Sequence, residues 1–235
     1  MDLPQMYSDT QSRFLDLVDS LPAPSLATKV PGTPEWVVEQ LAAHVTGVAA
    51  DVVDGRMDGA PEPPWTRRQL AERAGQPLPD VLAEWGRKTP ELLALLAIPG
   101  RTDPTAFDLF THEHDLRGAL GVSGPSDVDA MLFMTTRVTG RVGHMVDKAG
   151  LPALRLVHDE GEWVCGTASV GTTGTATPME WFRTLFGRRS AAQILTYEWE
   201  GDPSPYFDLL NLFGPLPEAD VTEAGAPESQ PLTLE

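Results

Sequence analysis

Acidic residues and histidines lie close together in the segment 106–121, which reads as one helix. Asp108 and His112 are four residues apart, and in a helix this spacing places both side chains on one face, one turn apart. A carboxylate and an imidazole held in this way can bind a divalent metal ion. A catalytic zinc usually takes three protein ligands and keeps a fourth position open, so the segment predicts a metal site that needs a third ligand from elsewhere.

The candidate for the third ligand is His44, on a helix expected from Thr33-Pro34 to about Asp54. Apolar residues recur on this helix at spacings of three and four, which indicates a stripe facing a core: Val37, Leu41, Val48 and Val52. His44 lies in the middle of that stripe. On this helix alone, a core histidine satisfied by a neighbouring carbonyl or hydroxyl is an equally good interpretation.

Three further side chains near His112 are weighed as participants. Glu113 is the rival metal ligand, ranked below Asp108 because adjacent residues on a helix diverge. His114 points about 200° around the helix from His112 and is expected to contact the surface or a second domain. Asp115 lies on the ligand face and could orient a ligand through a hydrogen bond, or pair with Arg117.

The elements that must position these residues form a helical bundle. The helix with Asp108 starts at Asp103-Pro104, as N-cap and first helical residue, and ends near Gly121. Further amphipathic segments are expected at 6–21, 66–73, 79–96 and 127–150. Pro90 predicts a kink or a break in its helix. We therefore expect an antiparallel bundle over residues 1–150.

The pattern changes after residue 150. Strands are expected at 154–157, 162–166, 168–175 and 195–199, with a helix from Thr177-Pro178 to about Gly187 and a short helical stretch at 206–213. Residues 151–216 therefore predict a small α+β domain. Residues 217–235 are acidic and rich in Pro, Gly and Ser, and are expected to be a disordered tail.

The composition limits the classes of partner. The chain has 235 residues and a net charge of −17, with three Lys and fourteen Arg, so neither nucleic acid nor an anionic membrane is an expected partner. The single cysteine, Cys165, excludes an internal disulfide and favours a reducing cytoplasm. No signal peptide and no membrane span are expected. The many Ala, Gly and Pro with little Lys suggest a GC-rich genome.

Three motifs resemble a known family. Pro34-Glu-Trp-Val-Val-Glu-Gln-Leu-Ala-Ala-His44 resembles the opening of the DinB-like bundle superfamily. Trp65-Thr-Arg-Arg-Gln-Leu-Ala-Glu-Arg73 and His112-Glu-His-Asp-Leu-Arg-Gly-Ala-Leu-Gly121 resemble its actinobacterial branch, the mycothiol-dependent maleylpyruvate isomerase family. A looser resemblance joins Met179–Arg188 to a helix in that family's small C-terminal domain.

The resemblance covers about residues 5 to 215 and implies a fold and a site. The fold is α+β: a DinB-like antiparallel four-helix bundle followed by a small α+β C-terminal domain. The family's metal ligands, two His and an acid, map onto His44, Asp108 and His112. The family acid is commonly Glu, and Asp108 is one methylene shorter. An arginine that handles substrate maps onto Arg188, with Arg189 as the alternative.

The resemblance also implies a function. We expect a cytoplasmic, actinobacterial enzyme that uses Zn²⁺ or another divalent metal, with mycothiol as thiol cosubstrate. It would isomerise or conjugate a small electrophile that carries a carboxylate, as a monomer or homodimer. The alternatives are a non-catalytic metal-binding or regulatory bundle and, ranked last, a metal hydrolase with Glu113 or Asp115 as base. Cys165, between Val164 and Gly166, reads as a packed strand residue rather than a nucleophile.

Overall fold

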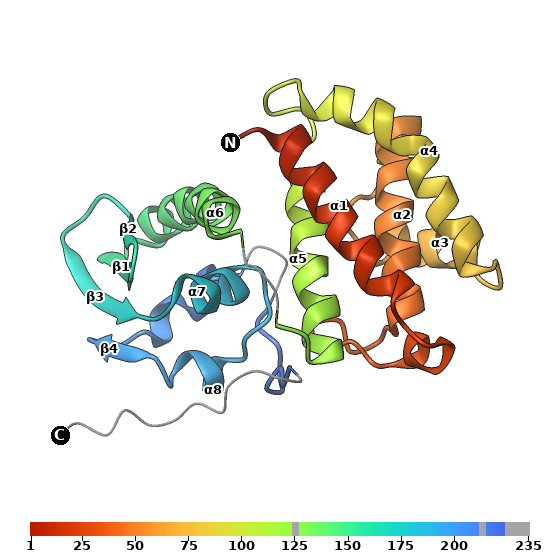
Figure 1. Ribbon diagram of the computed structural model, residues 1–235. Coiled ribbons are helices and arrows are strands. Elements are labelled where there is room, and N and C mark those ends of the chain that lie inside the picture. The colour runs from red at the N-terminus through yellow and green to blue at the C-terminus, as the bar shows by residue number, and fades with distance from the viewer. Residues whose placement is uncertain (124–126, 212–214, 224–235) are drawn as a thin grey trace. The chain divides into compact units, whose positions relative to one another are not determined.

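The computed structural model describes residues 1–123, 127–211 and 215–223 and shows a helical part and a part with a small sheet (Figure 1). The chain divides into two compact units. The first comprises Met1–Gly124 with Glu223–Glu235, and the second comprises Pro125–Thr222. Within the described residues, no helix combines the length and the hydropathy needed to span a membrane.

The first unit is a four-helix bundle with one short helix added. Its elements are α1 (Leu3–Asp19), η1 (Ala23–Ala27), α2 (Val38–Asp54), α3 (Pro63–Arg73), α4 (Leu78–Leu96) and α5 (Asp103–Leu120). Helix α1 packs on α5, α5 on α2, α2 on α4, and α4 on α1, which closes a ring of four helices, while α3 packs on α2. The expected four-helix bundle is therefore confirmed, and it is built from α1, α2, α4 and α5.

Large apolar side chains from all four helices meet inside this ring. Phe14, Leu41, Trp85 and Phe110 come from α1, α2, α4 and α5 in turn, and each is fully buried. Burying one such side chain stabilises the fold by about 1.5–3 kcal/mol. The indole N–H of Trp85 donates to the Tyr7 hydroxyl at 2.7 Å, so the one polar atom of that side chain is also satisfied.

Two details of the bundle differ from the sequence-based expectation. Helix α2 begins at Val38 rather than Thr33, because the Trp36 N–H closes a turn on the Thr33 carbonyl and Val37 pairs with Lys29 as an isolated bridge. Of the kink or break expected at Pro90, the break is wrong: helix α4 continues through Pro90, since a proline removes only one donor and its helix is held by packing on α2 and α1.

The second unit combines helices with a four-stranded sheet. Its elements are α6 (Val128–Ala149), β1 (Ala153–His158), β2 (Gly161–Cys165), β3 (Val170–Thr175), α7 (Pro178–Leu185), α8 (Ala191–Ile194), β4 (Glu198–Glu200) and η2 (Ser204–Leu209). The strand order is β2-β1-β3-β4. Strand β1 pairs antiparallel with β2 and parallel with β3, and β3 pairs antiparallel with β4.

Helix α6 belongs to this second unit by its contacts. It packs on β1, β2, α7 and η2, so the boundary between the compact units lies one helix before the boundary at residue 150 that the sequence predicts. Helical periodicity shows that 127–150 has an apolar face, but it does not show which element covers that face. Of the tail expected at 217–235, residues 224–235 lie outside the described part of the chain.

Candidate metal centre

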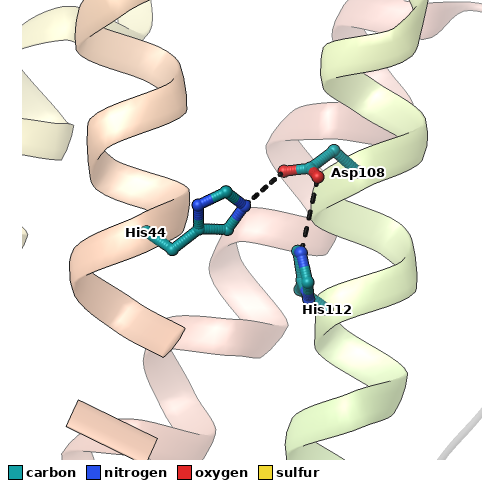
Figure 2. A group of neighbouring side chains, drawn as sticks. All are labelled: His44, Asp108 and His112. Carbon is teal, nitrogen blue, oxygen red and sulfur yellow. Dashed lines mark ion pairs between the residues drawn. The ribbon is translucent and has the colours of Figure 1, made fainter. Parts of the chain in front are cut away.

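Helices α2 and α5 pack on each other and bring His44, Asp108 and His112 together. One ligand atom from each of the three lies within 4.8 Å of the other two. Figure 2 shows His44 on one helix facing Asp108 and His112 on the other. The i, i+4 pair on α5 and the histidine in the apolar stripe of α2 therefore meet at one point, as the sequence predicts.

The two histidines approach the same carboxylate with the same ring nitrogen. The distance from His112 Nε2 to Asp108 Oδ1 is 3.4 Å, and that from His44 Nε2 to Asp108 Oδ2 is 3.6 Å (Figure 2). Both imidazoles are buried, whereas 28% of the Asp108 side chain is exposed. The group is thus closed around the histidines and accessible beside the carboxylate.

The other ring nitrogen of each histidine has its own partner. His112 Nδ1 lies 2.9 Å from Oδ2 of Asp115, which is fully buried. His44 Nδ1 lies 2.9 Å from Oε1 of Gln69, on α3. Carboxylate and amide oxygens only accept hydrogen bonds. Each imidazole therefore carries a proton on Nδ1, which in the neutral ring leaves the Nε2 lone pair directed at Asp108.

Charges in this group shift two pKa values. Burial by itself raises the pKa of Asp108, but the adjacent His112 and His44 rings outweigh it and hold that pKa far below its usual range. Burial by itself lowers the pKa of His112, but Asp108 and Asp115 outweigh it and raise that pKa above its usual value. The Asp108 carboxylate is thus ionised at neutral pH, and together with Asp115 it favours the protonated form of His112.

The donor set fits a divalent cation. Two Nε2 lone pairs and a carboxylate converge, and a cation bound between them would relieve their mutual repulsion. Zinc binds such atoms at ~2.0–2.1 Å in a tetrahedron, which puts two ligand atoms about 3.3 Å apart. The separations of 3.4 and 3.6 Å between nitrogen and carboxylate oxygen, each to a different oxygen of Asp108, are close to that value. Three ligands would leave one coordination position for water or substrate.

A tryptophan ring lies against both histidines. The Trp36 ring centroid is 4.7 Å from that of His44 and 6.0 Å from that of His112. The indole is held there because the Lys29–Val37 bridge and the turn at Thr33 fix the backbone on both sides of Trp36. It forms an apolar wall, which strengthens electrostatic interactions inside the group by excluding water.

The rival candidates near His112 have other partners. Glu113 is buried and accepts hydrogen bonds of 2.8–3.1 Å from Arg13 on α1 and Arg117 on α5, and it is not part of the metal-ligand group. His114 lies against the Phe110 ring at 4.8 Å between centroids. Asp115 accepts the hydrogen bond from His112 Nδ1. The interpretation of Asp115 as a residue that orients a ligand therefore matches the geometry.

The remaining candidates belong to the second unit. Arg188 is buried and donates from Nη1 to the Phe186 carbonyl at 2.7 Å. Arg189 binds Glu180 through two hydrogen bonds of 2.6 and 2.8 Å. A substrate role for Arg188 stays a prediction. Cys165 is fully buried, and burial raises the pKa of its thiol to about 12, which agrees with a packed strand residue.

Comparison with known proteins shows to which family the chain is related. Residues 8–147, more than half of its length, match the family described as "Mycothiol maleylpyruvate isomerase N-terminal domain". The chain belongs to this family. No match was found among curated protein sequences. The family match extends into α6, as far as residue 147, although α6 belongs by its contacts to the unit with the sheet.

Two solved structures from the isomerase family share the fold. One is the crystal structure of the mycothiol-dependent maleylpyruvate isomerase, with a TM-score of 0.52 and 10% identity over 79% of this chain and 88% of that chain. The other is a mutant of that isomerase in which alanine replaces a histidine, with a TM-score of 0.51 and 9% identity over the same shares. At such identities the likeness establishes the α+β, DinB-like fold.

Proposed function

We propose that the protein is a metal-dependent enzyme, with zinc as the metal, that uses a low-molecular-weight thiol on a small electrophile. Mycothiol is the thiol, and the reaction is isomerisation or conjugation of a maleylpyruvate-like substrate. One observation carries the proposal: His44, Asp108 and His112 converge with both Nδ1 atoms already bound, so that three acceptors face one point. Membership of the family supplies the thiol and the substrate class.

Zinc at this site would lower the pKa of a coordinating thiol and so supply thiolate at neutral pH. The protein supplies the rest. An imidazole that coordinates a metal is neutral and Asp108 carries one negative charge, so a divalent cation held by these three residues would keep one net positive charge for an anionic sulfur. The Trp36 wall limits water at the same place, and the exposed side of Asp108 leaves access for the thiol.

The chemistry follows from the thiolate. Its sulfur electron pair forms a bond to the electron-poor carbon of a double bond, and the π pair moves onto the conjugated carbonyl oxygen. Rotation about the resulting single bond, return of that pair and expulsion of the sulfur with its own electron pair give the other geometric isomer and regenerate the thiolate. Protonation of the carbon next to the carbonyl instead retains the sulfur and gives a conjugate. Arg188 is proposed to bind the substrate carboxylate, which guanidinium can hold by two hydrogen bonds.

Two alternatives are weighed against this function. A metal hydrolase needs a general base near the metal, but Glu113 is bound to two arginines and Asp115 to His112, so neither carboxylate is placed to activate water. A non-catalytic metal-binding bundle is the second candidate. It is favoured by Asp108, where the family commonly has the longer Glu.

Turnover with and without thiol separates these functions. We expect the zinc-loaded protein to isomerise a maleylpyruvate-like cis electrophile, followed by ultraviolet absorbance, only when mycothiol is present. His44→Ala should reduce the rate to that of the thiol alone, whereas His114→Ala should retain it. Turnover of an ester or amide without thiol would indicate a hydrolase. Stoichiometric metal without turnover in any thiol would leave the non-catalytic bundle.

A further inference from the structure

The strongest unassigned feature is a chain of hydrogen bonds that begins at His44 and ends in a buried cluster of charges. His44 Nδ1 lies 2.9 Å from Gln69 Oε1, and Gln69 Nε2 donates to Asp51 Oδ2 at 2.9 Å. Gln69 and Asp51 are both fully buried. The chain therefore joins a proposed metal ligand on α2, through α3, to a second residue of α2 seven positions later.

Asp51, at the end away from His44, sets which groups donate and which accept along this row of hydrogen bonds. The Asp51 carboxylate accepts two hydrogen bonds from Arg68, at 2.8 and 3.2 Å, and lies 2.8 Å from Nη2 of Arg56. An ionised carboxylate only accepts, so the Gln69 amide must turn its NH₂ group toward Asp51. Its oxygen then faces His44, and His44 must donate from Nδ1. A glutamine between two acceptors or two donors would have no such preference.

The backbone of α2 leaves room for this arrangement at one place. Gly47 lies one turn after His44, and a Cβ atom there would meet Gln69 Cβ at 2.6 Å and Cγ at 2.8 Å. Helix α3 is fixed at this distance by two further contacts: the Trp65 indole N–H donates to the Arg56 carbonyl at 3.1 Å, and Arg73 pairs with Glu84 of α4. Helix α3 is thus fixed both before and after Gln69.

We propose that Gln69, with Asp51 and Arg68 behind it, is a positioning residue that fixes the Nδ1–H tautomer of His44 and aims its Nε2 at the metal. Helix α3 then serves the site by carrying Gln69. The proposal rests on the proposed metal site for its consequence, since partners of ligand histidines commonly contribute to metal affinity. The tautomer itself is a property of the protein without metal.

The two histidines are then held by unequal partners. His112 donates to the Asp115 carboxylate, whereas His44 donates to a neutral amide. A carboxylate acceptor makes the imidazole a more basic ligand than an amide does. Asp51 acts on His44 through the amide dipole of Gln69, because its own charge is paired with Arg56 and Arg68, which also bind Glu72.

The decisive test replaces Gln69 without changing its size. Gln69→Met keeps the side-chain length but removes the acceptor, and we expect the dissociation constant for Zn²⁺, measured by competition with a chelator, to rise about 10–100-fold. In the metal-free protein, ¹⁵N-histidine spectra should show His44 changing from the Nδ1–H tautomer to a mixture. Gln76→Ala, which removes an exposed amide bonded to the Glu72 carbonyl, is the matched control and should change neither value.

A double substitution separates hydrogen bonding from packing. Gln69→Glu combined with Asp51→Asn exchanges carboxylate and amide, keeps the net charge and retains an acceptor for His44. It should restore the Nδ1–H tautomer and most of the zinc affinity that Gln69→Met loses. If Gln69→Met does not fold, Asp51→Asn alone tests the chain one bond further out, because the fixed polarity of Gln69 is lost and the Nδ1–H fraction of His44 should fall.

Failure of this proposal differs from failure of the metal site. Gln69→Met with wild-type zinc affinity and an unchanged His44 tautomer would overturn the positioning role and leave the metal site standing. A wild-type protein that binds no zinc would overturn the metal site, and the tautomer comparison in the metal-free protein would still decide what Gln69 does.

Discussion

At the scale of the residue, the two histidines of the proposed site are oriented through their Nδ1 atoms, which face away from the proposed metal. His112 and His44 both direct Nε2 at Asp108, and both use Nδ1 for a buried oxygen. Hydrogen bonds of this kind orient the ring and select its tautomer. The neighbouring Glu113 is equally buried but serves packing of α1 on α5 through Arg13.

Adjacent carboxylates on α5 should therefore respond differently to loss of charge. Asp115→Asn weakens the partner of His112 and is expected to reduce zinc affinity by about 10-fold or more. Glu113→Gln should leave zinc stoichiometry unchanged but lower the free energy of unfolding by about 1.5–3 kcal/mol, since charged hydrogen bonds to two arginines are weakened. Chelator competition and urea unfolding measure the two effects, and equal loss of zinc affinity in both variants would contradict the assignment.

The ligand residues could be predicted from sequence because each carries a local signal. Asp108 and His112 are one helical turn apart, and His44 interrupts an apolar stripe. Asp115 was within reach of the same reasoning, being three residues from His112. Gln69 was not predicted as a site residue, although it lies in a motif that resembles the family. No spacing within α3 shows that its glutamine meets a histidine 25 positions earlier.

At the scale of the element, α2 combines a proposed metal ligand with small residues that allow close packing. Ala42, Ala43, Ala49 and Ala50 are buried with Gly47 on this helix. Helices α3, α4 and α5 all pack on α2, and small side chains let their backbones approach. The position of α3, and with it that of Gln69, therefore depends on the absence of a side chain at Gly47.

Alanine at two glycines should have opposite effects. Gly47→Ala places a Cβ 2.6 Å from Gln69 Cβ, and such overpacking is expected to cost about 1–3 kcal/mol of stability and to weaken zinc binding by displacing Gln69. Gly86→Ala is the control on α4, where a Cβ meets nothing within 4 Å. It should stabilise the fold by about 0.5–1 kcal/mol with unchanged affinity. Thermal unfolding and chelator competition give both values, and unchanged zinc affinity in Gly47→Ala would argue against a coupling of α3 to the site.

Element types could be predicted well and their neighbours less well. Periodicity and caps located the helices, but the start of α2 moved to Val38 because a backbone bridge to Lys29 competes with the cap at Thr33-Pro34. Helix α6 shows an apolar face in the sequence, yet its contacts are with β1, β2 and α7. Which surface covers an apolar face is decided by long-range packing, which no local pattern contains.

At the scale of the whole molecule, the proposed cation site lies in a strongly acidic chain. A net charge of −17 repels anionic substrates, so binding of a carboxylate depends on local positive charge. In the proposed function, a divalent cation at His44, Asp108 and His112 supplies such a charge.

Metal content tests this account most directly. Protein purified without a metal-affinity tag should carry about one zinc per chain, measured by plasma mass spectrometry. His112→Ala should lose that zinc, whereas His114→Ala, two residues away, should retain it. A wild-type protein that holds no zinc after purification and takes up none when zinc is added would contradict the metal centre and, with it, thiol activation at this site.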